Sequence, residues 1–388
     1  MTIPLSPAHH LHVRGGKKGE WDLPHNRRSG FKNLYKNHRY GMSCRAPQMV
    51  PLSVNIDFKL HDIDTVRWYS SHPFFDGLCV TKGSDVVFEH YASDCHADDI
   101  HSIQSISKTL VHLIAGKLHE QGKLDTSLPV NHFIKHIGSG YAYASVQQVM
   151  DMAVANEYSE DYYDATAMLN QLEDAHGWRI DSSIPHRTMR EFFPTIHNGG
   201  VSAGPGEHHY KTANTDIVAW ICEVCCGIDI RSLVLDIVDA FAPEHSIFVS
   251  TDRSGVPFLG GGLHMTLRDL CRYGRLLGRG GQGYTGKHVG STSFTQQTMH
   301  SRVDGTQSHL GVSYHNFLET NGRWIGHLGY GGQLLMVYPE HDIVIACFSS
   351  LLDDGGLDPA FSQRQVAMAE HIADYLIKKP SQKSSYAL

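Results

Sequence analysis

The chain has 388 residues, 41% hydrophobic and 19% charged, which is enough to bury a large core in one large domain or two interlocked domains. Its formal net charge of -7 provides no basic surface field for nucleic acid, so we expect a small-molecule substrate and no nucleic-acid partner. No apolar run of 18 residues and no apolar leader segment occurs, and we therefore expect a cytoplasmic protein without membrane contact.

The first half of the chain predicts an arm, a hairpin and a helix. Residues 1–50 are polar and basic but carry interleaved aromatic residues, which favours a packed arm over a free tail. Residues 78–81 and 86–91 are rich in β-branched and aromatic residues around a Lys-Gly-Ser-Asp turn, which is typical of a β-hairpin. Apolar residues at helical spacing over 106–118 predict a helix that Ser105 and Lys108 open and Gly122 ends.

The rest of the chain predicts a helical middle and a strand-rich end. Helical patterns fall at 146–152, 165–178, 215–225, 232–241 and 267–277, whereas strand patterns fall at 311–318, 324–330, 333–338 and 343–348. A closing helix is expected near 359–377. We therefore expect an α+β fold, with one antiparallel sheet built from both ends of the chain, flanked by helices, and a helical domain inserted between them. The expected division is an arm at 1–50, a sheet domain at 51–125 plus 301–388, and a mainly helical domain at 126–300.

Two Ser-x-x-Lys spacings occur, and their context separates them. Ser29 and Lys32 lie in the basic arm without helical periodicity, whereas Ser105 and Lys108 lie in the first turn of the expected helix. A spacing of three puts both side chains on one helix face. A serine hydroxyl needs a nearby base to become nucleophilic, and a lysine is a base only when burial or neighbours lower its pKa from about 10.4.

The histidines and cysteines do not predict a metal site or a cofactor. The chain has 28 histidines but no His-Glu-x-x-His, so a metal-dependent hydrolase is supported by the histidine count alone. Cys222, Cys225 and Cys226 lie within an apolar helical pattern and lack a second pair at zinc-finger spacing. The eight cysteines are irregularly spaced, and we expect reduced thiols.

Two further motifs follow the Ser105 pair in order. Tyr210-x-Thr212 precedes a Thr-Asp-x-x-x-Trp helix, and the stretch GGGLHMTLRDL occupies residues 260–270. The order of these motifs resembles the serine β-lactamase-like hydrolases of the class C and penicillin-binding type. That resemblance implies that Tyr210 is the catalytic tyrosine, that Thr212 is the small polar third position, and that Lys211 points elsewhere.

The third motif of that family is Lys-Thr-Gly on an edge strand, and its best counterpart is His327-Leu-Gly329. The resemblance implies that the N–H groups of Ser105 and Tyr330 form the oxyanion hole. Since the motif lysine helps to bind the carboxylate of β-lactams, its replacement by His327 argues against β-lactamase activity.

The chain is more similar to the esterase and amidase branch that includes 6-aminohexanoate-dimer hydrolase. The likeness lies in residues 151–179, with the sequence EDYYD at 160–164, and in residues 24–28 of the arm. It implies a substrate-binding segment in which Tyr162 is the candidate, with Tyr158 and Tyr163 as alternatives. Gly329, Thr212 and His327 are the other candidate substrate-binding residues.

The expected activity is a two-step acyl transfer on an amide or ester. Ser105 attacks the carbonyl, Lys108 with Tyr210 accepts its proton, Tyr210 returns a proton to the leaving group, and water hydrolyses the acyl-enzyme. Which of Lys108 and Tyr210 is the primary base is left open. The alternatives are a carboxylesterase or acyltransferase, a weak β-lactamase, and a non-catalytic sensor on the same fold. A homodimer is possible.

Overall fold

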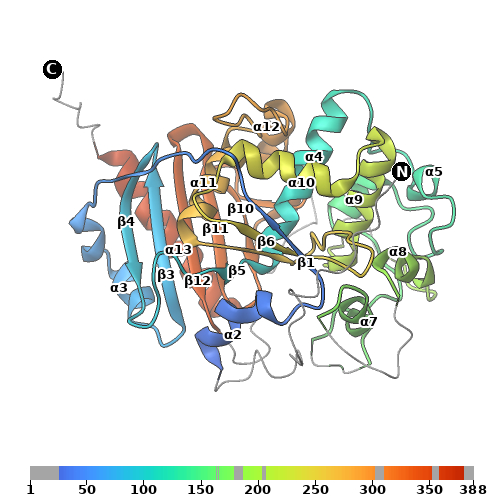
Figure 1. The fold of residues 1–388 in the computed structure, drawn as a ribbon, viewed down its shortest axis with the longest axis horizontal. Coiled ribbons are helices and arrows are strands. Elements are labelled where there is room, and N and C mark those ends of the chain that lie inside the picture. Colours follow the sequence, from blue (N-terminus) through green and yellow to red (C-terminus); the bar gives the residue numbers. More distant parts are fainter. Residues whose placement is uncertain are drawn as a thin grey trace.

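A computed structural model describes residues 26–162, 164, 166–178, 187–202, 207–301, 310–351 and 358–379. Its larger sheet is built from strands of the N-terminal part of the chain and strands of the C-terminal part (Figure 1). In spatial order its strands are β2 (Ser53–Val54), β4 (Asp85–Tyr91), β3 (Phe75–Lys82), β12 (Ile343–Ser349), β11 (Gln333–Tyr338), β10 (Ile325–Gly329), β9 (Leu318–Thr320) and β8 (Ser313–His315).

Both faces of this sheet are buried, because successive side chains along its strands point in turn into two hydrophobic clusters, one on each face. On β11, Leu334 and Met336 pack with the helices α3 (Asp64–Ser70) and α13 (Pro359–Lys378), whereas Leu335 and Val337 pack on the opposite face. That opposite face is covered by α11 (Leu267–Gly278), which contacts β3, β11 and β12. The expected α+β fold with a sheet built from both chain ends is therefore confirmed.

The sheet departs from the expectation at its edges. The short strand β2 runs parallel to β4, so the sheet is mixed and not purely antiparallel. At the other edge, the single strand expected over 311–318 is two strands joined at Asn316 and Phe317, both of which have positive φ. The backbone N–H of Phe317 donates to Met150 and that of Asn316 to Asp151, so contacts distant in sequence hold this turn.

A second, smaller sheet was not expected. Its order is β1 (Gly41–Cys44), β6 (Ile247–Ser250), β7 (Leu263–Met265) and β5 (His101–Ser102), and every pairing is antiparallel. Two of these strands lie inside the stretch predicted to be mainly helical, and β1 lies in the arm. Strands of two to four residues are too short to give a clear alternation pattern.

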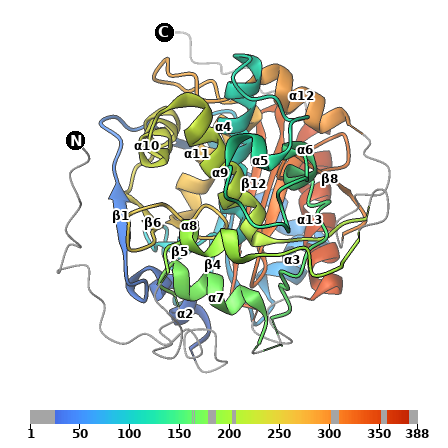
Figure 2. The ribbon, with the colours of Figure 1, turned by 90° about the vertical axis from the view of Figure 1, so that its right-hand side faces the viewer.

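The remaining helices lie mostly beside the large sheet, and Figure 2 shows α5, α7, α8 and α9 towards the viewer. The α-helices are α2 (Arg27–Asn33), α4 (Thr109–Glu120), α5 (Val130–Phe133), α6 (Val146–Met150), α7 (Met168–Ala175), α8 (Met189–Phe192), α9 (Thr212–Cys226), α10 (Ile230–Phe241) and α12 (Thr292–His300). The 3₁₀ helices are η2 (Leu34–Lys36), η3 (Phe58–Asp62), η4 (Gln104–Lys108), η5 (Phe193–Thr195) and η6 (Pro339–His341).

Most of the predicted helices are present, with shifted ends. The helix expected to begin at Ser105 is 3₁₀ in its first turn and α-helical from Thr109, and Gly122 follows it with φ of 67°. The pattern at 165–178 corresponds to α7, which begins three residues later than expected. All eight cysteines lie in the described part of the chain, where they are free thiols. Within the described ranges, no helix has the length and hydropathy that a bilayer crossing requires.

Candidate active site

Ser105 lies where the smaller sheet meets the first turn of helix η4. The strand β5 ends at Ser102, and Gln104, immediately before Ser105, has φ of 50° in the left-handed region. That conformation is unfavourable for a residue with a side chain and is typical of functional turns. It is supported by a hydrogen bond from Gln104 Nε2 to Ser102 Oγ, 2.9 Å long. Ser105 is left half-buried at the wall of a cavity.

Lys108 lies one helical turn later and is fully buried. Its Nζ is 2.9 Å from Ser105 Oγ, 2.6 Å from the carbonyl oxygen of Gly260 and 3.3 Å from Thr212 Oγ1. Burial lowers the pKa of Lys108 to about 8, against the opposing effect of the carboxylates of Glu160 and Asp216. A lysine with this pKa is neutral in a substantial fraction of molecules near pH 8.

Tyr210 faces the same pair from the segment before α9. Its ring centroid is 5.0 Å from Lys108 Nζ. Burial raises the pKa of Tyr210 well above its ordinary value, and the nearby Glu160 carboxylate raises it further, while a hydrogen bond with Ser105 opposes the shift. The structure thus brings together Ser105, Lys108 and Tyr210, the three candidate catalytic residues.

Thr212 connects Lys108 to an acidic side chain that the sequence did not single out. Thr212 Oγ1 donates to Glu160 Oε1 over 2.5 Å, and the backbone N–H of Thr212 donates to the other oxygen of the same carboxylate. The hydroxyl of Tyr162 also donates to Glu160, over 2.9 Å. Glu160 appeared in the sequence only as a neighbour of Tyr162, and no local pattern identified its contact with Thr212.

The carbonyl that accepts from Lys108 belongs to a tight glycine loop. A Cβ on Gly260 would lie 2.5 Å from Thr212 Cγ2, so only glycine allows this approach. The loop is fixed by Asp216, whose Oδ1 accepts from the backbone N–H of Leu259 over 2.7 Å. Asp216 is the aspartate of the Thr-Asp-x-x-x-Trp motif. In the sequence, its position shortly after Tyr210 was the one sign that it belongs to the site.

The end of strand β10 lies against the turn that carries Ser105. A Cβ on Gly329 would lie 2.7 Å from the carbonyl oxygen of Ile103 and 3.0 Å from Gln104 Cβ. The absence of a side chain at Gly329 therefore lets the strand approach the nucleophile turn closely. The next residue, Tyr330, lines the cavity together with Ser105.

His327 lies on the same strand and is buried. Its Nε2 is 3.1 Å from the hydroxyl of Tyr314, and its ring is 6.3 Å from that of Tyr210. The cavity has a volume of about 450 Å³. Its described lining consists of Ser105, Glu160, Asp161, Tyr162, His208, Tyr210, Tyr314, Glu319, His327, Leu328, Gly329, Tyr330, Gly332, Asp358, Pro359 and Ser362.

Other residues considered in the sequence lie elsewhere. Lys32 binds Asp99 and the carbonyl of Asp94, and Ser29 is exposed, so the alternative Ser-x-x-Lys match does not form a paired site. Lys211 points away from the cavity, with its Nζ 2.5 Å from the carbonyl oxygen of Tyr158.

Some sequence expectations lie outside the described residues, namely Tyr163, Arg179, and the arm as far as residue 25. In the described part of the chain, no group of three or more His, Cys, Asp or Glu side chains is arranged to hold a metal ion.

Comparison with known proteins gives a consistent match. Residues 76–367 match the family model described as Beta-lactamase. The 6-aminohexanoate-dimer hydrolase of Paenarthrobacter ureafaciens is 30% identical over 290 residues, which cover 72% of this chain and 73% of that protein.

Two solved structures share the fold. A Bacillus anthracis protein proposed to be a 6-aminohexanoate-dimer hydrolase has a TM-score of 0.81 at 22% identity, covering 94% of this chain and 98% of its own. A hydrolase with promiscuous acyltransferase activity has a TM-score of 0.59 at 11% identity, covering 80% of this chain and 97% of its own.

Proposed function

The chain belongs to the β-lactamase family and is a serine hydrolase, and from this premise we propose that it cleaves a small-molecule amide or ester through an acyl-enzyme on Ser105. The observation that carries the proposal is the 2.9 Å contact between Lys108 Nζ and Ser105 Oγ, made by a fully buried lysine whose pKa is lowered to about 8. A neutral amine at this distance can accept the hydroxyl proton as the oxygen attacks the carbonyl.

Hydrogen-bond partners orient the lone pair of the neutral Lys108. A neutral amine has two N–H donors and one lone pair. The carbonyl oxygen of Gly260 can only accept, so it takes one N–H. The Thr212 hydroxyl gives its own proton to Glu160, so its oxygen takes the second. The lone pair is left for the Ser105 hydroxyl, which then donates to Lys108.

We assign the acid step to Tyr210. Its raised pKa keeps the phenol protonated at neutral pH, so it is suited to donate a proton and poorly suited to begin as a phenolate base. Lys108, with the lowered pKa, is the better primary base. When the tetrahedral intermediate collapses, Tyr210 gives its proton to the leaving nitrogen or oxygen, and Lys108 reprotonates it.

The N–H groups of Ser105 and Tyr330 are the proposed oxyanion hole. The proposal is supported by the close approach of Gly329 to Ile103 and Gln104, which brings the end of β10 beside the nucleophile turn. Two backbone donors fixed in this way stabilise the charge that develops on the carbonyl oxygen. Tyr162, Thr212, His327 and Gly329 stay proposals as substrate-binding residues.

The charge of the cavity favours substrates without a carboxylate near the reacting carbonyl. Four described lining residues carry carboxyl groups, at Glu160, Asp161, Glu319 and Asp358, and none of the described lining residues is lysine or arginine. By the sequence resemblance, His327 is the best counterpart of the motif lysine. An anionic β-lactam would meet like charge, and the described lining offers no lysine or arginine to bind its carboxylate, so amides and esters that are neutral around the scissile bond are the proposed substrates.

Covalent labelling tests the nucleophile and the substrate class together. A fluorophosphonate probe should add to the Ser105 peptide, and intact-mass spectrometry should detect acyl-enzymes from a panel of neutral esters and amides. Ser105→Ala should abolish both while the far-UV circular dichroism spectrum stays unchanged. Adding an acceptor alcohol separates hydrolysis from acyl transfer.

The sensor alternative predicts a folded wild-type protein without adduct on Ser105, and that result would overturn the proposal. A metal-dependent hydrolase would instead lose activity with a chelator. The possible homodimer is tested by light scattering of the purified protein.

A further inference from the structure

Phe31, on the N-terminal helix α2, is fully buried behind the proposed oxyanion hole. Its ring stacks on His101 with centroids 5.4 Å apart and lies 6.4 Å from the ring of Tyr330. It also fills the space beside Gly331, where a Cβ would lie 2.2 Å from Phe31 Cζ. One aromatic ring from the arm therefore contacts both the strand before Ser105 and the loop after β10.

The loop that carries Tyr330 is rich in glycine. It is held by packing and by hydrogen bonds, since the N–H of Leu351 donates to the carbonyl of Gly331 and Gln365 Nε2 donates to that of Gly332. Gly329 precedes Tyr330, and Gly331 and Gly332 follow it with φ of 80° and 84°. Glycine restricts the backbone less than any other residue, so the position of the Tyr330 N–H depends in part on what packs against the loop. Phe31 packs there.

The other half of the proposed hole is held from the same side. His101 lies on β5, four residues before Ser105, and its ring is sandwiched between Phe31 and Phe348, with a centroid distance of 4.4 Å to Phe348. Its Nε2 is 3.2 Å from Asp76 Oδ2, and its Nδ1 is 2.8 Å from the carbonyl of Ser102. The segment leading to Ser105 is thus packed and hydrogen-bonded.

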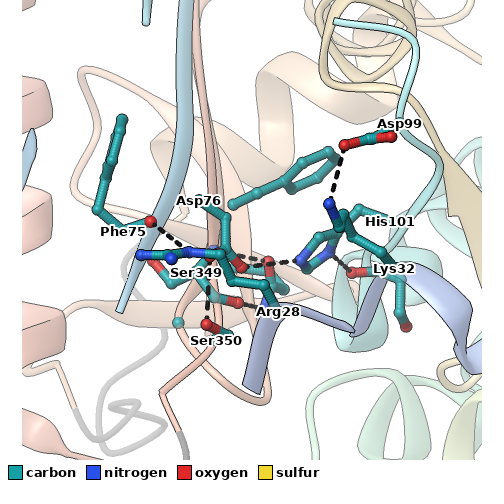
Figure 3. A network of polar contacts seen from close by, with 12 residues as sticks. Arg28, Lys32, Phe75, Asp76, Asp99, His101, Ser349 and Ser350 are labelled. Carbon is teal, nitrogen blue, oxygen red and sulfur yellow. Dashed lines mark hydrogen bonds and ion pairs between the residues drawn. The ribbon is translucent and has the colours of Figure 1, made fainter. Parts of the chain in front are cut away.

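Arg28, one turn before Phe31, anchors α2 to the same carboxylate. Its Nε donates to Asp76 Oδ1 over 2.6 Å and to the carbonyl of Phe75 over 3.0 Å. Figure 3 shows Arg28 and His101 converging on Asp76 from different elements, with Ser350 adding a 3.2 Å bond from the end of β12. Because Asp76 is only 2% exposed, its charge requires these partners, and the helix that carries Arg28 is fixed in place.

We propose that Phe31 is a positioning residue for the oxyanion hole: anchored through Arg28, it sets the separation between the N–H of Ser105 and the N–H of Tyr330. The inference rests on the proposed function, in which these two N–H groups bind the oxyanion. Phe31 is not among the described residues that line the cavity, and it acts through His101 and the glycine loop. Removing it leaves the nucleophile and base in place while the oxyanion donors become poorly aligned.

Steady-state kinetics on the full chain test this role, with Phe88 as a matched control. Phe88, on β4, is equally buried, and its ring contacts His61 and not the site. With a neutral p-nitrophenyl ester, Phe31→Ala should lower kcat by about 10- to 100-fold, which is less than the loss of roughly 10²- to 10³-fold on removing a donor outright, because both donors remain. KM should change by less than about threefold. Phe31→Leu should lose less, and Phe88→Ala should lower the melting temperature while keeping kcat.

A boronic acid separates positioning from general loosening. The tetrahedral adduct of a boronic acid on Ser105 places an oxygen in the oxyanion hole. The affinity of the boronic acid for the Phe31→Ala variant should therefore fall by the same factor as kcat, whereas KM for the ester should stay nearly unchanged. Arg28→Gln should show the same pattern in weaker form. Phe31→Leu keeps the test valid if Phe31→Ala does not fold.

Two results would overturn the inference. One is a kcat of both Phe31 variants within about twofold of wild type, and the other is a kcat loss that Phe88→Ala reproduces. Either result leaves labelling of wild-type Ser105 intact, whereas failure of the proposed function would show as no labelling of wild type at all. The two failures are therefore distinguishable.

Discussion

Lys108 donates from its Nζ to the carbonyl oxygen of Gly260 across 2.6 Å, and this bond persists whether the lysine is charged or neutral. A carbonyl cannot donate in return, so it holds one N–H of the amine permanently. Gly260 therefore orients Lys108 without preventing it from losing its proton.

The pH dependence of activity should follow Lys108. Its pKa is lowered to about 8 by burial, and only the neutral form accepts the Ser105 proton, so kcat/KM should rise with pH and level off above about 8. Below the midpoint the rate should fall about tenfold per pH unit. A profile that is flat from pH 6.5 to 9 would contradict the assignment of Lys108 as base. Lys108→Arg, which stays charged, should be inactive across this range.

Glu160→Gln should move that midpoint to lower pH. The Glu160 carboxylate raises the pKa of Lys108, so removing its charge lowers the pKa further. The plateau value of kcat/KM should also fall by about tenfold. A glutamine amide can donate to the Thr212 hydroxyl, which would then no longer be fixed as the acceptor of an N–H from Lys108. Glu157→Gln is the control, because Glu157 is exposed and binds the N–H of His197 instead. An unmoved midpoint in Glu160→Gln would refute the electrostatic link.

The free energy of unfolding should depend on pH because burying the charged form of Lys108 is unfavourable. Its folded pKa of about 8 lies below the ordinary 10.5, so below pH 8 both states bind the proton and the full burial cost is present. Between pH 8 and 10.5 only the unfolded state keeps the proton, and the contribution of Lys108 to folding stability rises by on the order of 3 kcal/mol.

Lys108→Met should accordingly unfold at higher urea concentration than wild type at pH 7, and this advantage should shrink at pH 10. Denaturant titrations at the two pH values measure the difference. Parallel behaviour of the two proteins would show that Lys108 keeps an ordinary pKa in the folded state.

His327→Lys should improve acylation by carboxylate-bearing β-lactams. The lysine restores the cation of the family motif at the wall of an acidic cavity, and a hydrogen bond to a charged group corresponds to roughly tenfold in rate or affinity. Intact-mass detection of the penicilloyl adduct measures the rate. The turnover of a neutral ester by the same variant is the reference, and an equal rise for both substrates would exclude carboxylate recognition.

The parts of the site that depend on local geometry were predictable. Ser105 and Lys108 are three residues apart, and a helical turn brings their side chains together whatever the rest of the chain does. Tyr210 was identified because three motifs occur in the same order as in the β-lactamase-like hydrolases. The hairpin β3–β4 was predicted because its turn and its strand composition are contiguous.

The parts that depend on long-range contacts were not predictable. The turn at Asn316 and Phe317 is held by Met150 and Asp151, and a phenylalanine at positive φ has no sequence signature. Glu160 reaches Thr212, and Phe31 reaches Tyr330, across large sequence separations. The expected domain division and the homodimer stay predictions.

The pairing of β3 with β12 also means that one strand of this pair is synthesised long before the other. The N-terminal hairpin leaves the ribosome early, but the strand that covers its inner edge begins only at Ile343. At typical elongation rates that strand emerges on the order of tens of seconds later. Throughout that interval the edge of β3 that later pairs with β12 has no native partner, and its unpaired N–H and C=O groups expose the nascent chain to wrong strand pairing.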